Sequence, residues 1–535
     1  MATPARTRDV PHTPDGSGAR TAADPSAQRT PVARRPAAGV ATAVAVLVAW
    51  VATLPRLVPS TTGDHGTYVS VAERLLAGDR LYVDVWDNKD PFFYYVLALG
   101  RLVSPLADVV IEVGWVVLAG MAVVVLARAA GAARGLSLVA GLGATPLLLT
   151  GPAYETGMTH LPGLALVLLA VASAVRSRWV LAGVLVGLLL LTKLILTPVA
   201  VGSLVVVAVH RRREHGLAGL VRSALAGAAT VAVGVGALWA RGELAGWLGN
   251  FRLNADYADG ELAQSQYGSV VGHLLRAFPE DGRGGGAVSV VALAVTLLVI
   301  RRSWTRTSLP AATGAGPTGS DGALRPQTIS PAVLWDLALV TLGLALVVIA
   351  ATATWPHHAQ SLSVPGGCAL ALVATRLSQM AVGWRPAALL LLAGYAAAGA
   401  LHPYFYLTSA RGVPSSVRLL QQVSPASALL ASLPEVRTYA RVGSNDTAAH
   451  AVGLGALELA CPRFHQYAFI ESAAILDATA VCLPRADALI IDSLVQPQPG
   501  ATAWNAFVAQ VRTLVATGYD CSPAAGAEVC VRRAR

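Results

Sequence analysis

Charged residues are scarce in this chain, and their scarcity excludes most soluble folds. Asp, Glu, Lys and Arg make up 13% of the 535 residues, whereas apolar residues make up 54% and the mean hydropathy is +0.57. Apolar runs of about 14–22 residues recur, and most are long enough to cross a hydrocarbon core of about 30 Å. The sequence therefore predicts a polytopic α-helical membrane protein.

A basic face of the kind that binds nucleic acid is also missing. The net charge is +10, but Lys and Arg cluster in short segments beside the apolar runs. That distribution is the positive-inside pattern of membrane proteins. We therefore expect membrane lipids around the chain and no nucleic acid partner.

The segment 1–37 lacks apolar periodicity and is rich in Pro, Ala, Thr and Arg. This composition predicts a disordered cytoplasmic tail. The apolar run 38–59 is too long and too far from the start for a cleaved signal peptide. We therefore expect a retained anchor with its N-terminus in the cytoplasm.

The central segment 38–402 is predicted to form one transmembrane catalytic module in the plasma membrane. We expect about 11 spans, at 38–59, 109–128, 136–151, 159–176, 179–192, 194–209, 219–240, 286–301, 332–353, 359–378 and 385–402. The loops 60–91 and 241–285 then lie outside and the linker 302–331 inside. The run 92–106 contains Arg101, and a full span there would invert every later loop, so we expect a membrane-surface or bent helix.

The C-terminal segment 403–535 alternates short β-like runs with helical patterns, which predicts a small extracytoplasmic α/β domain. Four of the five cysteines lie in it, and their spacing fits no zinc motif. An even count outside the membrane fits two disulfides, with Cys461–Cys482 and Cys521–Cys530 as the pairs we expect. The alternative is four reduced, unrelated cysteines.

The most polar stretch near the membrane is 63–95, GDHGTYVSVAERLLAGDRLYVDVWDNKDPFFYY. Acidic groups at a membrane surface can act as bases, metal ligands or cation sites. We expect the chemistry of the protein in this first outer loop.

Several motifs resemble the GT-C superfamily of membrane glycosyltransferases. The loop above follows the pattern LLAGxxxY and then WDxKxPxxYY, and later segments read LAGVLVGLLLLTKLILTP and TWPHHAQSLSVPGGCALAL. More narrowly, they are similar to glycosyltransferase family 39, the branch of protein O-mannosyltransferases and lipid A aminoarabinose transferases, with its bacterial relatives. This sequence departs from that pattern at His65, at Asp90 where relatives have Pro, and at Ala359 where they have Tyr.

The resemblance implies an enzyme that moves a sugar from a polyprenyl-phosphate donor to an acceptor at the outer membrane surface. The acceptor would be a lipid, a polysaccharide or a protein. Such a reaction needs a base for the acceptor proton and cations for the leaving phosphate. Asp64 is the candidate base, and its alternative role is to cap or precede a helix over 67–77. His65 is a candidate auxiliary group or a polar surface residue.

Four cationic or imidazole side chains are candidates for the donor phosphate. Lys193 lies between two apolar runs, where a lysine is costly unless it faces a cavity or a hairpin tip at the outer interface; the alternative is a snorkelling side chain. Lys89 would contact phosphate or pair with Asp87 or Asp90. His357 and His358 follow Trp355 at a predicted outer span end, where the alternative is an interfacial cap.

Auxiliary or acceptor contacts are expected from a second group of residues: Asp84, Asp87, Glu155 and Tyr257. The loop 241–285 mixes aromatic side chains with carboxylates, which suits sugar stacking and equally an interfacial belt. No DxD triplet occurs in the first loop, and we expect no metal cofactor. Carboxylate oxygens there would otherwise suit Mg²⁺ or Mn²⁺.

Two other classes of protein compete with a transferase. A lipid or solute transporter or flippase would place charges within several spans, yet the sequence has no internal repeat and no matched pair of broken helices. A non-catalytic envelope-binding membrane protein would tolerate loss of Asp64.

Overall fold

The computed structural model describes residues 47, 50–51, 53–59, 63–149, 156–214, 216–258, 329–351, 356–380, 423–444, 450–463, 466 and 473–534. The predicted tail 1–37, most of the anchor 38–59, the spans 286–301 and 385–402 and nearly all of the linker 302–331 lie outside the described residues.

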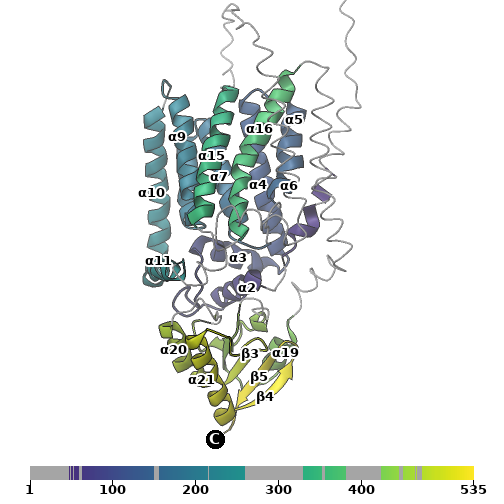
Figure 1. The fold of residues 1–535 in the computed structure, drawn as a ribbon, viewed down its shortest axis with the longest axis vertical. Coiled ribbons are helices and arrows are strands. Elements are labelled where there is room, and N and C mark those ends of the chain that lie inside the picture. The colour runs from purple at the N-terminus through teal and green to yellow at the C-terminus, as the bar shows by residue number, and fades with distance from the viewer. Residues whose placement is uncertain are drawn as a thin grey trace, which may run out of the picture.

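Three of the described helices are long and apolar enough to cross a membrane: α4 (Ala107–Ala129), α10 (Gly216–Ala240) and α15 (Pro331–Ala351). Shorter apolar elements pack beside them (Figure 1), namely η1 (Leu54–Leu57), α5 (Arg134–Leu138), η2 (Val139–Ala144), α6 (Thr145–Leu149), α7 (His160–Val175), α8 (Trp179–Leu190), η3 (Leu194–Leu196), α9 (Thr197–His210), η4 (Pro356–Leu362) and α16 (Ser363–Gln379). Apart from η1, these elements, with consecutive short ones taken together, coincide within a few residues with runs predicted as spans.

Small residues let α8 and α10 approach closely. A Cβ atom on Gly183 would lie 2.0 Å from the Ser223 carbonyl oxygen, and one on Gly187 would lie 2.7 Å from the Gly227 carbonyl oxygen. Backbones in such contact gain van der Waals packing, which is the main attraction between helices in a membrane.

Three helices lie between this bundle and the C-terminal sheet: α2 (Gly63–Leu76), α3 (Pro91–Val103) and α11 (Leu244–Ala258) (Figure 1). The 13 residues of α3 give a length of about 20 Å, which is too short to cross the hydrocarbon core. Leu97 on α3 is buried, whereas Leu99 and Leu102 are exposed. A short helix with one buried and one exposed apolar face agrees with the expected membrane-surface helix.

The C-terminal residues form a five-stranded sheet of order β2-β1-β3-β5-β4. The strands are β1 (Thr438–Val442), β2 (Glu458–Leu459), β3 (Ala488–Asp492), β4 (Tyr519–Ala524) and β5 (Ala527–Arg532). β1 is parallel to β2 and β3, and β5 is antiparallel to β3 and β4. The helices of this part are α19 (Pro425–Ala431), α20 (Ala473–Cys482), η7 (Leu483–Arg485) and α21 (Thr502–Gly518).

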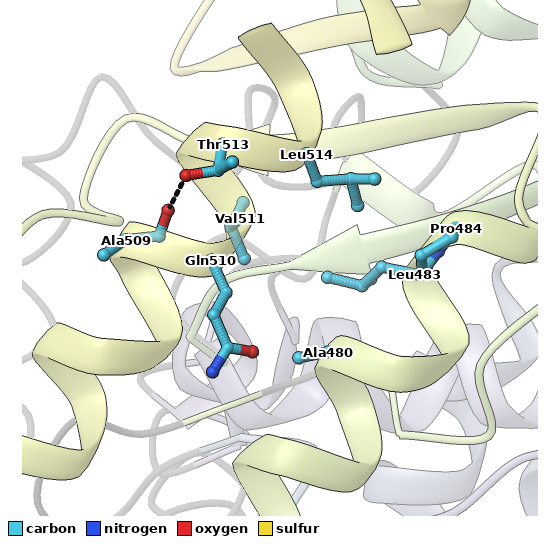
Figure 2. A pocket seen from close by; sticks show the side chains of 8 residues that line it. All are labelled: Ala480, Leu483, Pro484, Ala509, Gln510, Val511, Thr513 and Leu514. Carbon is cyan, nitrogen blue, oxygen red and sulfur yellow. Dashed lines mark hydrogen bonds between the residues drawn. The ribbon is translucent and has the colours of Figure 1, made fainter. Parts of the chain in front are cut away.

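Both faces of the sheet are covered. Ala440 and Leu489 face one apolar cluster with Phe507 of α21, whereas Tyr439 and Ile490 belong to the other, which also contains residues of α2. This alternation is the period-2 pattern of a strand buried on both sides. A hollow between α20 and α21 is lined by Ala480, Leu483, Pro484, Ala509, Gln510, Val511, Thr513 and Leu514 (Figure 2).

Two disulfides join the cysteines of this part. Cys461 bonds to Cys482, with Cα atoms 5.6 Å apart, and Cys521 bonds to Cys530 across β4 and β5. These are the two pairs expected from the sequence, and Cys368 is buried and free.

Candidate active site

The first outer loop packs onto the connection between α8 and α9. The backbone N–H of Phe92 donates to the Leu191 carbonyl at 2.9 Å, and that of Leu194 donates to Asp90 Oδ2 at 3.4 Å. The loop is closed on itself by Tyr82, whose hydroxyl donates to the Lys89 carbonyl at 2.7 Å. These contacts bring Lys89 and Lys193, which are 104 residues apart in the sequence, to one place.

Asp64 lies beside this pair of lysines. It occupies the first turn of α2, so the helix starts before Asp64. The helix expected over 67–77 would have started after it. The Tyr68 hydroxyl donates to Asp64 Oδ2 at 3.1 Å, and Lys89 Nζ lies 5.9 Å from the centre of the Tyr68 ring. Lys89 Nζ donates to Asn88 Oδ1 at 2.7 Å, which differs from the alternative interpretation of an ion pair with Asp87 or Asp90.

Lys193 lies in the connection between α8 and α9 and is partly buried. Burial of the ammonium group and the positive charge of Lys89 lower the pKa of Lys193 from 10.5 to about 7, against the opposing effect of Asp90 and Asp64. An amine in this condition is charged in about half of the molecules at neutral pH. Any nearby anion would stabilise its charged form.

Asp90 holds the loop and the connection together. Its carboxylate accepts from the Trp247 indole N–H at 3.3 Å as well as from Leu194. Burial raises the pKa of Asp90, while these two hydrogen bonds and the two lysines act in the opposite direction. The position where relatives have Pro therefore carries a structural carboxylate in this chain.

The two other acidic candidates of the loop have structural partners. Asp84 forms an exposed ion pair with Arg80, with Nε and Oδ2 2.9 Å apart, and hydrogen bonding to that guanidinium lowers the pKa of Asp84. Asp87 is buried, accepts from the Tyr94 hydroxyl and receives the Asn88 backbone N–H at 2.5 Å. These contacts tie Asp84 and Asp87 to Arg80, Tyr94 and Asn88.

His65 is buried, so the interpretation of this residue as polar surface is wrong. Its Nε2 lies 3.3 Å from Asp108 Oδ2 at the start of α4, which makes Nε2 the donor in that bond. The ring packs against Gly157, where an added Cβ would lie 2.0 Å from Nδ1. Glu155 lies outside the described residues, and so do the side chains of Tyr257 and His357.

His358 pairs with a histidine that the sequence motifs did not single out. The rings of His160 and His358 lie 5.2 Å apart between centroids, and His160 is buried. Three residues after His160, a Cβ on Gly163 would lie 3.0 Å from Lys193 Cβ. Because residues three apart share a helix face, the imidazole pair lies on the side of α7 that faces Lys193.

Glu243 is a second residue that sequence reasoning missed. It is fully buried just before α11, and its Oε1 accepts from the Leu81 backbone N–H at 3.1 Å and from Arg241 Nε at 2.7 Å. Its Oε2 accepts from the Tyr95 hydroxyl at 2.5 Å. The signal available in the sequence was an acidic residue shortly after an apolar run, but two of its three partners lie about 150 residues earlier.

Among the described residues, Cys521, Glu528 and Cys530 form the one group of three potential metal-ligating side chains. The two cysteines are joined in a disulfide. Because metals bind the thiolate form, this group does not form a metal site. The expectation that no metal is required stays a prediction.

Comparison with known proteins adds a family and a fold. The model of glycosyltransferase family 87 matches residues 90–319. ArnT from Cupriavidus metallidurans is 16% identical, with a TM-score of 0.52 over 92% of this chain and 98% of that one. The oligosaccharyltransferase AglB from Archaeoglobus fulgidus is 12% identical, with a TM-score of 0.45 over 93% of this chain and 74% of that one. No curated protein matches the chain.

The chain shares its overall fold with ArnT, and three of the described helices are long and apolar enough to cross a membrane. Together with this fold, the match to a GT-C-type glycosyltransferase family over residues 90–319 supports a membrane glycosyltransferase of the GT-C superfamily. The superfamily expected from the sequence motifs is thereby confirmed. Within it, the matching family model is that of family 87, whereas the motifs resembled family 39.

Proposed function

We propose that this glycosyltransferase moves a sugar from a polyprenyl-phosphate donor to an envelope acceptor at the outer face of the plasma membrane. The observation that carries the proposal is the grouping of one carboxylate, Asp64, with two lysines, Lys89 and Lys193, next to the apolar helices. A carboxylate can take a proton and two cations can hold a phosphate, and the reaction requires both.

The reaction would proceed by direct displacement. Asp64 accepts the proton of the acceptor hydroxyl as its oxygen bonds to the anomeric carbon of the sugar. The bond between that carbon and the phosphate oxygen breaks, and polyprenyl phosphate leaves with its additional negative charge. Lys89 and Lys193 stabilise this charge, and His358, with His357 on the same turn, would add imidazole contacts. The anomeric configuration inverts.

The arrangement of the protein relative to the membrane follows the same proposal. The apolar helices would span the bilayer with the N-terminus inside. The surface helices α3 and α11 would lie at the outer interface, and the sheet of the segment 403–535 would stand outside. The two disulfides support an oxidising compartment for this domain. Glu155 and Tyr257 remain proposed acceptor or auxiliary contacts.

The test uses purified protein in lipid nanodiscs with a panel of radiolabelled polyprenyl-phosphate sugars and an envelope extract as acceptor source. We expect label to leave one donor in the wild type and not in Asp64→Asn. Asp84→Asn is the matched control, because it removes a loop carboxylate that is paired with the exposed Arg80. Equal turnover in wild type and Asp64→Asn would remove Asp64 as the base. No turnover of any donor by folded protein, with acceptor present, would contradict the donor class. A product with retained configuration would contradict direct displacement.

A further inference from the structure

The single charge in the apolar helix α3 has a defined place in the structure. Arg101 is buried, with 6% of its side chain exposed, and its guanidinium binds two carboxylates. NH1 lies 2.8 Å from Asp108 Oδ2 on α4, and NH2 lies 3.1 Å from Glu73 Oε1 near the end of α2. A planar fork with several N–H donors can bridge two acceptors in this way, whereas a lysine cannot reproduce the geometry.

Asp108 extends this network to the start of α2. The same oxygen that accepts from Arg101 lies 3.3 Å from His65 Nε2, and both the Asp108 and His65 side chains are at most 3% exposed. His65 directly follows Asp64 in the first turn of the helix. One guanidinium therefore holds both ends of α2, through Asp108 and His65 at the start and through Glu73 at the end.

The far end of the network reaches the C-terminal sheet domain. Glu73 Oε2 accepts the Gly453 backbone N–H at 2.7 Å. Burial raises the pKa of Glu73, while the bond from Gly453 and the charge of Arg101 favour its ionised form. Charges buried to this extent are stable only when they are paired, so the removal of one partner disturbs the others.

We propose that Arg101 is a positioning residue, which fixes the carboxylate of Asp64 by holding α2 at both ends through Asp108–His65 and Glu73. This inference rests on the proposed function of Asp64 as the base. It explains why an otherwise apolar surface helix contains an arginine. Misplacement of a reacting group by about 1 Å is enough to slow a reaction about a hundredfold.

The test compares Arg101→Lys with Arg74→Lys. Arg74 is a matched control because it is equally buried near the end of α2, but its guanidinium pairs with Asp79 and the Leu457 carbonyl instead of Asp108. For Arg101→Lys we expect kcat to fall at least about tenfold, with the donor KM within about twofold of wild type. The acidic limb of the pH profile of kcat/KM should shift, because the environment of the base changes. Arg74→Lys should lower the melting temperature and leave kcat and that limb unchanged.

Other outcomes overturn the inference. A folded Arg101→Lys variant with the kcat and the acidic limb of the wild type would overturn it. A fall in kcat and a shifted limb in Arg74→Lys would also overturn it, since both substitutions would then act through general stability. If Arg101→Lys does not fold, Glu73→Gln replaces it, and an unshifted limb in that variant refutes the role. Full activity of Asp64→Asn would reject the proposed base together with this inference, whereas an inactive Asp64→Asn beside a normal Arg101→Lys would reject this inference alone.

Discussion

The low pKa of Lys193 makes donor binding dependent on pH in a range that is easy to measure. In the proposed function the charged ammonium binds the donor phosphate, and this charge is lost as pH rises through about 7. An unperturbed lysine would keep its charge to about pH 10. We therefore expect donor affinity to be highest below pH 7 and to fall between pH 7 and pH 9.

The size of the effect follows from the fraction of charged amine. At pH 8 about one tenth of the free protein carries a charged Lys193, so the apparent Kd should be about tenfold weaker than at pH 6. The fall must level off, because a neutral amine loses only the charge-assisted bond, worth about 1.5–3 kcal/mol, or about 10–150-fold in affinity. The expected curve is therefore a rise in Kd that begins near pH 7 and reaches a plateau.

The assay is equilibrium binding of a fluorescent polyprenyl-phosphate methyl diester to the protein in nanodiscs. A phosphodiester keeps one negative charge throughout pH 6–9, so the titration belongs to the protein. Lys193→Arg should bind with little change over this range, because a guanidinium stays charged. Lys193→Met should bind weakly at every pH. A wild-type Kd that stays constant from pH 6 to pH 9, or an unchanged slope in Lys193→Met, would refute the assignment.

Three further substitutions test the packing, two of them beside the candidate site and one in the C-terminal sheet. Gly157→Ala adds a Cβ at a φ of +73° and 2.0 Å from the His65 ring, so we expect a loss of about 1–3 kcal/mol in unfolding free energy and slower turnover; an unchanged melting temperature would contradict the close approach. Glu243→Ala leaves buried donors without their acceptor and should cost at least about 1–3 kcal/mol, measured by thermal unfolding, with no loss as the contrary result. Asp492→Asn leaves the fully buried Arg441 without its ion-pair partner, and we expect a loss of about 3–5 kcal/mol seen as proteolysis of the C-terminal domain; resistance equal to wild type would argue against this.

The predictable part of the fold follows from length and composition. Apolar runs predicted the helices from 107 to 240, because a membrane span needs a run of fixed length and little else. The start of α2 was predicted less well: the sequence pattern began at Thr67, whereas the helix begins at Gly63. Its first turn contains two glycines and two polar residues, so it carries no apolar periodicity that could reveal it.

The candidate site was predictable where residue type alone sets the chemistry. Asp64, Lys89 and Lys193 are groups whose burial is costly beside a membrane, and the structure brings them together. Asp84 and Asp87 are closer in sequence to Lys89, yet they have other partners. Proximity in sequence says little about a loop that is folded by distant contacts.

Residues that act through distant partners were beyond reach of the sequence. Arg101 appeared only as an obstacle to a span, and its role depends on the way α2, α3 and α4 meet. The same holds for Glu243, since its partners Leu81 and Tyr95 come from the first loop. In both cases a buried charge was visible in the sequence, and its cost implied a partner that only the fold identifies. A charge that interrupts an apolar run in such a protein is therefore a marker of a tertiary contact near the site. Of the charges interrupting or ending such runs, Lys193 is the one that would contact the donor phosphate in the proposed function, whereas Arg101 and Glu243 bind the elements around it.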